Sequence, residues 1–175
     1  LQTNKIQYIS DQKLNELNLI ASKMTLNSSV YNYVISSGAE DEDAVCSEIK
    51  YITTTFDYID SVVVYSDTKQ SYLYTAAEIP CLERYPDIYL NINSQKYTYK
   101  FIKNENYYTD FITLVKPIYI STDYKIGALF FNISTYHYES FLNDANNTSR
   151  CYLTDGDGTV IIGKDAAGKK ICDIP

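Results

Sequence analysis

The chain has 175 residues and a mass of 20.0 kDa, enough for one well-formed hydrophobic core. Its net charge of −7 and isoelectric point near 4.6 disfavour nucleic acid as a partner, because phosphate binding needs clustered Lys and Arg. Hydrophobic residues make up 45%, which argues against disorder. Tyrosine is unusually frequent, with 19 copies, and its ring with a polar tip suits half-buried sheet faces and pocket linings.

The first 56 residues show helical periodicity. Residues 2–26 contain no Gly or Pro and carry one apolar stripe, which predicts a long amphipathic helix. The stripe consists of Ile6, Ile9, Leu14, Leu17, Ala21 and Met24. Residues 27–29 end that helix, and a shorter segment follows to Gly38. The acids of residues 40–43 then begin a second helix, where negative charge complements the helix dipole. Its apolar face is Val45, Ile49, Ile52 and Phe56.

From residue 59 the apolar spacing changes to the strand period of two. Residues 61–66 and 71–75 predict a first hairpin around a polar turn. Residues 76–95 contain two prolines and predict a loop with short helical turns. Residues 96–102 alternate again and predict a third strand.

The longest predicted strand pair runs from Phe111 to Ser134, with a polar turn at residues 121–123. Its second arm, residues 125–133, is almost continuously apolar, as in strands that are covered on both faces. Pro117 has no N–H to give to a ladder, so the first arm should carry a bulge or lie at an edge there. Gly127 marks a place where backbone approaches closely or bulges.

The C-terminal part predicts a short helix over residues 135–145 and a last hairpin over residues 150–163. The hairpin turns at an Asp-Gly-Asp-Gly run, and Asp-Gly doublets supply the positive φ of tight turns. This run does not fit a calcium loop, because the twelfth position from Asp155 is Ala166, where a bidentate Glu is needed.

No catalytic motif is present. The chain has no P-loop, no Gly-x-Ser-x-Gly, no Gly-x-Gly-x-x-Gly and no His-Glu-x-x-His, and its one histidine, His137, has no companion ligands. The cysteines are Cys46, Cys81, Cys151 and Cys172. Their wide spacing argues against structural zinc, while their even number leaves open either two disulfides or free thiols. We expect no catalysis, no metal and no cofactor.

The order of the elements resembles the extracytoplasmic Cache domain, a PAS-like sensor fold of bacterial receptors. The resemblance is carried by IDSVVVYSDTKQSYLYT (residues 59–75), by residues 111–134 and by CYLTDGDGTVIIGKD (residues 151–165). The long helix followed by Ile-Asp-Ser-Val-Val-Val-Tyr looks most like sensor histidine kinases of low-GC Gram-positive bacteria. The expected fold is therefore α+β, with an antiparallel sheet of about five strands and helix 2–26 packed along it.

On this resemblance, residues 1–148 form the sensor domain, and residues 149–175 complete it or open a second, membrane-proximal lobe. We expect a non-catalytic fragment of a membrane-bound two-component sensor histidine kinase, on the extracellular side of the cell membrane, with the membrane anchor outside the sequence. The alternatives are the ectodomain of a chemoreceptor or cyclic-dinucleotide enzyme, and a secreted binding or adhesion domain. The first turns of helix 2–26 could pair with those of a second copy, so a homodimer is a further alternative.

The resemblance also implies a small-molecule site between the sheet and the loop of residues 76–95. The candidates are Tyr72, Tyr74, Arg84, Tyr107, Tyr108, Lys116 and Tyr119. Arg84 suits a carboxylate ligand, or else makes a surface ion pair with Glu83 or Asp87. Amino-acid-binding Cache domains carry an Arg followed two residues later by Trp-Tyr, and this chain has no Trp. The resemblance therefore implies no ligand class.

Overall fold

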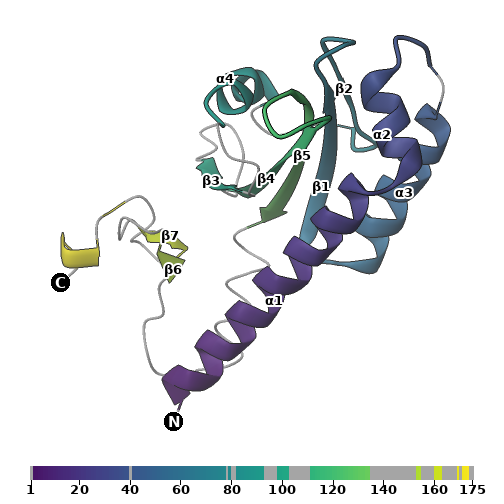
Figure 1. Cartoon of the computed structure of the whole chain (residues 1–175). Coiled ribbons are helices and arrows are strands. Elements are labelled where there is room, and N and C mark those ends of the chain that lie inside the picture. The colour runs from purple at the N-terminus through teal and green to yellow at the C-terminus, as the bar shows by residue number, and fades with distance from the viewer. Residues whose placement is uncertain are drawn as a thin grey trace.

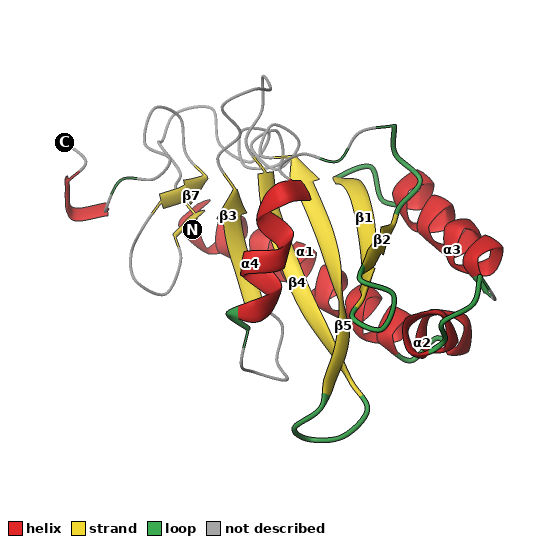
Figure 2. Ribbon diagram, turned by 90° about the horizontal axis from the view of Figure 1, so that it is seen from above, coloured by secondary structure: helices red, strands yellow, loops and turns green. Residues whose placement is uncertain are grey.

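Helices cover both faces of one antiparallel sheet in the computed structural model of the chain (Figures 1 and 2). The structure describes residues 2–39, 41–77, 79, 82–92, 98–102, 111–134, 153–154, 160–162, 169 and 171–173. The predicted helix at residues 135–145 lies outside this part of the chain, as do Tyr107, Tyr108 and His137.

Three helices precede the sheet: α1 (Gln2–Thr25), α2 (Ser28–Ile35) and α3 (Glu42–Thr55). Helix α1 confirms the predicted long helix. Asn27, which was expected only to end it, also caps α2, because its side-chain oxygen accepts the backbone N–H groups of Ser29 and Val30 at 2.9 and 3.4 Å. Helix α3 starts with Glu42 and Asp43 in its first turn, as the acidic run predicts.

The sheet has five strands in the order β2-β1-β5-β4-β3, and every neighbouring pair is antiparallel. The strands are β1 (Ile59–Ser66), β2 (Ser71–Leu73), β3 (Thr98–Ile102), β4 (Phe111–Tyr119) and β5 (Lys125–Ser134). The predicted α+β fold and number of strands are confirmed. The connection from β2 to β3 contains a short 3-10 turn, η1 (Leu82–Arg84), and helix α4 (Tyr85–Leu90), which matches the predicted loop with helical turns.

The backbone predictions for Pro117 of β4 and Gly127 of β5 are both confirmed. Among the described residues, β3 pairs with β4 as far as Val115, so Pro117 lies beyond that pairing, and the β4–β5 register shifts just after Ile118. A Cβ added to Gly127 would overlap the carbonyl oxygen of Tyr65 and lie 2.7 Å from Cγ1 of Val34. Gly127 therefore lets β1 and α2 approach β5 closely.

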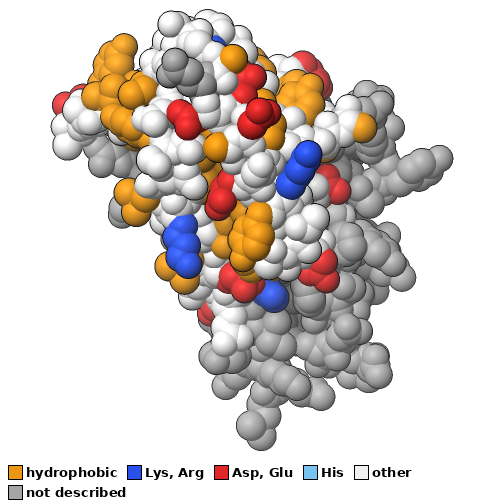
Figure 3. All heavy atoms as spheres, turned by 90° about the vertical axis from the view of Figure 1, so that its right-hand side faces the viewer, with side chains coloured by type: hydrophobic (Ala, Val, Ile, Leu, Met, Phe, Trp, Pro, Cys, Tyr) orange, Lys and Arg blue, Asp and Glu red, His pale blue; other side chains and the backbone are white. Residues whose placement is uncertain are grey.

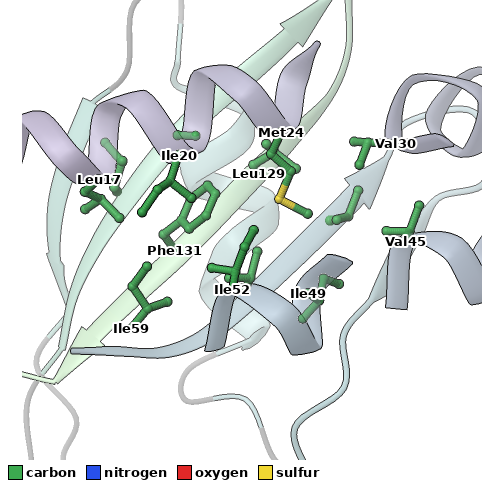
Figure 4. Packing of buried hydrophobic residues seen from close by; sticks show 14 of the residues in the cluster. Leu17, Ile20, Met24, Val30, Val45, Ile49, Ile52, Ile59, Leu129 and Phe131 are labelled. Atoms are coloured by element: carbon green, nitrogen blue, oxygen red, sulfur yellow. The ribbon is translucent and has the colours of Figure 1, made fainter. Parts of the chain in front are cut away.

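Helices α1, α2 and α3 pack on one face of the sheet, which we call the helix face (Figure 4). Leu17 and Met24 of α1, Ile49 of α3 and Phe131 of β5 are almost completely buried there. Ile20 also joins this core, although the predicted stripe omitted it. The burial of this apolar layer is the main force that holds the helices on the sheet.

The other face of the sheet, which we call the α4 face, is covered by residues from the β2–β3 connection (Figure 2). The predicted last hairpin is present as a separate two-stranded sheet of β6 (Leu153–Thr154) and β7 (Val160–Ile162), followed by a 3-10 turn, η2 (Ile171–Asp173). It lies outside the main sheet, on the side of β3 (Figure 1). Within the described residues, no helix is both long and apolar enough to cross a bilayer.

Candidate ligand-binding site

Three polar side chains form a row across the middle of the α4 face. Ser61 of β1 and Thr113 of β4 both stand opposite Asn132 of β5 in the strand register, so all three point to the same side. Each of these residues is at most 2% exposed. The Asn132 amide nitrogen donates to Ser61 Oγ at 2.9 Å, and its oxygen accepts from Thr113 Oγ1 at 2.8 Å. The hydrogen bonds offset the cost of burying these polar groups.

Tyr85, the first residue of α4, covers this polar row. Its hydroxyl donates to Asn132 Oδ1 at 2.8 Å, and its ring stacks on Phe130 with centroids 4.3 Å apart and planes 16° apart. Tyr85 is completely buried. It is therefore the residue that brings the segment Leu82–Ile92, hereafter the covering segment, to the centre of the sheet.

Further tyrosines surround this contact. Tyr65 of β1 packs against Tyr72 of β2 and Tyr89 of α4, with ring centroids 4.9 and 4.7 Å apart, and Tyr72 meets the edge of Tyr85 at 6.2 Å. Burial raises the pKa of Tyr65 to about 12 and also raises the pKa values of Tyr72 and Tyr89. These phenols stay neutral at physiological pH and offer apolar surface with polar tips.

Lys125, at the start of β5, fastens the far end of the covering segment. Its ammonium donates to the carbonyl oxygens of Tyr89 and Ile92, the latter at 2.9 Å, and lies 4.1 Å from the centre of the Tyr89 ring. The Tyr89 carbonyl lies in the last turn of α4 and the Ile92 carbonyl just beyond it, where a cation complements the helix dipole. Burial lowers the pKa of Lys125, and nearby Asp67 acts in the opposite direction.

The structure brings some of the predicted site residues together and separates others. Tyr72 of β2 and Tyr74 both pack against the hydrophobic cluster of the α4 face, as predicted, although β2 ends at Leu73, before the predicted end of the strand at residue 75. Lys116 lies opposite Leu129 in the register and therefore points to the helix face, away from them. Arg84 lies within η1, but its side chain is outside the described part, as are Tyr107 and Tyr108.

Lys116 and Tyr119 line a different hollow, at the junction of α1 and α2. This pocket has a volume of about 450 Å³ and is bounded by Thr25, Leu26, Ser28, Tyr31, Asn32 and residues 116–119. Its lining includes the end of β4, beyond its pairing with the described residues of β3. Tyr119 also stands opposite Lys125 in the register, so it lies at the border between the two regions.

The polar row and Tyr85 were not among the predicted site residues. Asn132 gave the clearest available signal, since it is the polar residue inside the apolar run of β5. Ser61 and Thr113 look like ordinary strand residues until the register is known. Tyr85 lies in a segment without periodicity, so its place over Phe130 depends on tertiary structure.

The described residues do not contain a cluster of three or more His, Cys, Asp or Glu that could hold a metal. Cys46 and Cys172 are free thiols, so the structure does not show the alternative in which all four cysteines pair. Burial raises the pKa of the Cys46 thiol.

Figure 3 shows acidic side chains and single lysines spread over the surface on the side of α2 and α3. The buried polar row at the centre of the α4 face consists of hydroxyl and amide groups.

The chain matches no protein-family model and no curated protein, but it resembles many solved structures. One is the sensory domain of the Campylobacter jejuni chemoreceptor Tlp3 with isoleucine bound: TM-score 0.65, 14% identity, covering 94% of this chain and 68% of that one. Another is the extracellular domain of vpHK1S-Z8, a protein described as a histidine kinase: TM-score 0.70, 13% identity, with the same coverages.

A third similar structure is the ligand-binding domain of the Pseudomonas aeruginosa amino-acid chemoreceptor PctB in complex with L-Arg. Its TM-score is 0.63 at 11% identity, and the match covers 93% of this chain and 69% of that one. At such identities the likeness establishes the fold alone. The chain shares the α+β fold of these sensory domains, in agreement with the fold expected from the sequence resemblance.

Proposed function

We propose that this chain is the extracytoplasmic ligand-sensing domain of a membrane receptor, and that a small molecule binds on its α4 face. The observation that carries the proposal is the buried polar row of Ser61, Asn132 and Thr113 beneath a separate covering segment. Small-molecule sites are mostly apolar with a few convergent polar groups, and this face has that composition. The similar structures support the proposal, since several are sensory domains solved with ligands.

The parent receptor is, in this proposal, a sensor histidine kinase anchored in the cell membrane, and the chain itself has no catalytic role. The sequence resemblance and the likeness to the extracellular domain of vpHK1S-Z8 support this output. A chemoreceptor is the second candidate, favoured by the likeness to Tlp3 and PctB. In either case, a ligand that moves the covering segment would alter its packing on the sheet. Helix α1 packs on the opposite face of the same sheet, so the change could reach α1.

The proposal also covers the bounds of the sensory unit and the residues that line the ligand site. Residues 1–148 form the sensory unit, and residues 149–175 open a second lobe; the separate β6–β7 sheet supports this division. Tyr72 and Tyr74 line the ligand site from the β1–β2 side, where they already contact the aromatic cluster. Arg84, Tyr107, Tyr108 and Tyr119 remain candidates around it, while Lys116 belongs to the pocket at α1 and α2.

A ligand screen with two matched variants tests the proposal. The purified chain is scanned by thermal shift against amino acids, hydroxylated aromatics, carboxylates and sugars, and each positive compound is measured by calorimetry. We expect saturable binding by at least one class, weakened about tenfold by Asn132→Ala, equivalent to about 1.4 kcal/mol. Thr54→Ala, on the exposed side of α3, should leave the affinity unchanged.

Two outcomes of this screen contradict the proposal. The sensing role fails if no compound from any class binds saturably. The assignment of the site fails if a compound binds equally well to Asn132→Ala but is lost from Lys116→Ala, because the pocket at α1 and α2 would then be the binding site.

A further inference from the structure

We infer that Tyr85 occupies the place of the ligand, and that the ligand is an uncharged hydroxylated aromatic compound that replaces the Tyr85 ring. The inference rests on the proposed function and names the ligand class and the mode of regulation of the same site. It follows from three features: where Tyr85 comes from, what it touches, and which charges surround it.

Tyr85 belongs to the connection between β2 and β3, and it enters the sheet face from outside. The covering segment holds it over Phe130 through a helix of only six residues, α4. The layer on the helix face is built differently, from the longer helices α1, α2 and α3. A short connecting segment is the part of such a fold that can move without taking the core apart.

The contacts of Tyr85 are those that a bound phenol would make. A flat ring lies on Phe130, and one hydroxyl hydrogen points to Asn132 Oδ1, which Thr113 already holds in place. The helix face has no such row of hydroxyl and amide side chains: among the described residues, its buried serine is Ser66, which donates to the backbone oxygen of Val34, and the Lys69 ammonium is buried separately against the Tyr33 ring. Asn132 Oδ1 thus gives the α4 face an acceptor for a hydroxyl group. Apolar packing alone would not require such an acceptor.

The charges around the row favour a neutral ligand. Ser61, Thr113, Asn132 and Tyr85 are uncharged, and the Lys125 ammonium is engaged with the carbonyl oxygens of Tyr89 and Ile92 at the end of the covering segment. An ionised group placed on the row would lose its hydration, and the four uncharged residues of the row supply no counter-charge. This separates the site from the isoleucine and L-Arg complexes of the similar structures. Lys100 stands opposite Thr113 in the register of β3, so a variant at Lys100 tests for an anionic ligand.

Replacement of Tyr85 has a structural consequence. It breaks the stacking on Phe130, the ring contact with Tyr72 and the hydrogen bond to Asn132. The ligand then makes the same contacts in place of the protein, and the covering segment shifts relative to the sheet. The signal of the proposed receptor is this exchange of an internal phenol for an external one.

The test uses p-cresol, which is the side chain of tyrosine as a free molecule, and toluene, which lacks the hydroxyl. Binding to the whole chain is measured by calorimetry, and the ring signal of Tyr85 is followed by NMR with ring-labelled tyrosine, assigned through Tyr85→Phe. We expect p-cresol to bind the unmodified chain and to shift the Tyr85 signal to that of an exposed ring. Toluene should bind at least tenfold more weakly.

Variants sharpen the test. Tyr85→Ala removes the internal competitor and should bind p-cresol at least tenfold more tightly; if this variant does not fold, Tyr85→Phe keeps the ring and should still gain several-fold. Asn132→Ala should abolish the preference for p-cresol over toluene. Lys100→Ala should leave p-cresol affinity unchanged, and 4-hydroxybenzoate should bind more weakly than p-cresol to the unmodified chain.

The inference is overturned if p-cresol binds only the Tyr85 variants, since Tyr85 would then be a permanent core residue. It is also overturned if another compound binds the unmodified chain while the Tyr85 signal stays unchanged, a result that leaves the sensing role intact. Stronger binding of 4-hydroxybenzoate that depends on Lys100 would replace the neutral class with an anionic one. Failure of every compound would remove the proposed function as well.

Discussion

Asn132 decides the chemistry of the α4 face at the scale of single residues. One amide joins β1, β4 and the covering segment, because it donates to Ser61 and accepts from Thr113 and Tyr85. Buried polar groups in such a network are costly when one partner is lost.

The variant Asn132→Ala should therefore destabilise the chain even without a ligand. It leaves the hydroxyls of Tyr85 and Thr113 without their acceptor, and each unsatisfied buried group costs about 1–3 kcal/mol. We expect a loss of about 2–4 kcal/mol in the free energy of unfolding, measured with urea, summing the lower part of that range over these partners. The control Asn15→Ala, on the exposed side of α1, should change it by less than about 0.5 kcal/mol. Equal values for the two variants would show that the network contributes nothing.

Gly127 is decisive on the helix face. In Gly127→Ala the new methyl group would overlap the Tyr65 carbonyl oxygen, which belongs to the backbone and cannot rotate away. Overpacking of this kind costs about 1–3 kcal/mol and more against a rigid backbone, so we expect a loss of about 3 kcal/mol in the unfolding free energy. A loss below about 0.5 kcal/mol in the same urea titration would mean that β1 and β5 are less closely packed than described.

These residues differ in how far the sequence foretells them. Pro117 and Gly127 act through their own backbone chemistry, so an edge or bulge and a close approach were predictable at each position. Asn132 becomes meaningful only when the register places it between Ser61 and Thr113. The alternation along β4 separates Lys116 from the α4 face, and this also needed the register, since a shift of one residue exchanges the faces.

At the scale of elements, the covering segment is attached to the sheet at two places. Tyr85 attaches its beginning through Asn132 and Phe130, and Lys125 attaches its end through the carbonyl oxygens of Tyr89 and Ile92. The sequence predicted a loop with helical turns here but neither attachment, because both join residues far apart in the chain.

The attachment by Lys125 can be removed while most of the apolar stem of the side chain is kept. Lys125→Met keeps an apolar stem but loses the two hydrogen bonds, so local opening of residues 85–92 should become easier by about 1 kcal/mol. Their backbone amides should then exchange with deuterium about fivefold faster, while those of β1 and β5 keep their rates. Lys50→Met, on the exposed side of α3, is the matched control. Unchanged exchange in residues 85–92 would show that Lys125 does not hold the segment.

At the scale of the whole molecule, a layer of three helices and a tyrosine-rich layer enclose one sheet. In the first layer, α1 and α3 were predictable from their periodicity, apart from Ile20, whereas the sequence indicated only a short segment where α2 lies. The second comes from a connection without periodicity, so the sequence indicated its place over the sheet but not the packing of its rings.

The buried tyrosines should make the fold sensitive to alkaline pH. Burial raises the pKa of Tyr65 to about 12 and raises those of Tyr33, Tyr72 and Tyr89, whereas an unfolded tyrosine titrates near 10. The unfolded chain therefore releases protons first, and the stabilisation present below about pH 10 is lost as the pH rises towards 12. Lys125, with its lowered pKa, acts in the opposite direction as a single group.

We expect the unfolding free energy in urea to fall steadily between about pH 10 and 12, in step with the ultraviolet absorbance of tyrosinate. Tyr65→Phe removes one of these groups and should make the decline shallower. A stability that stays level over this range would contradict the burial of the ring layer.

Hydrogen–deuterium exchange of the whole chain, with and without a compound found in the ligand screen, tests the central claim most directly. A ligand on the α4 face should change exchange in the covering segment and in the central strands β1 and β5, and leave the amides of α2 and α3 at their free rates. Changes confined to residues 25–32 and 116–119, around the pocket at α1 and α2, with the covering segment unaffected, would contradict it.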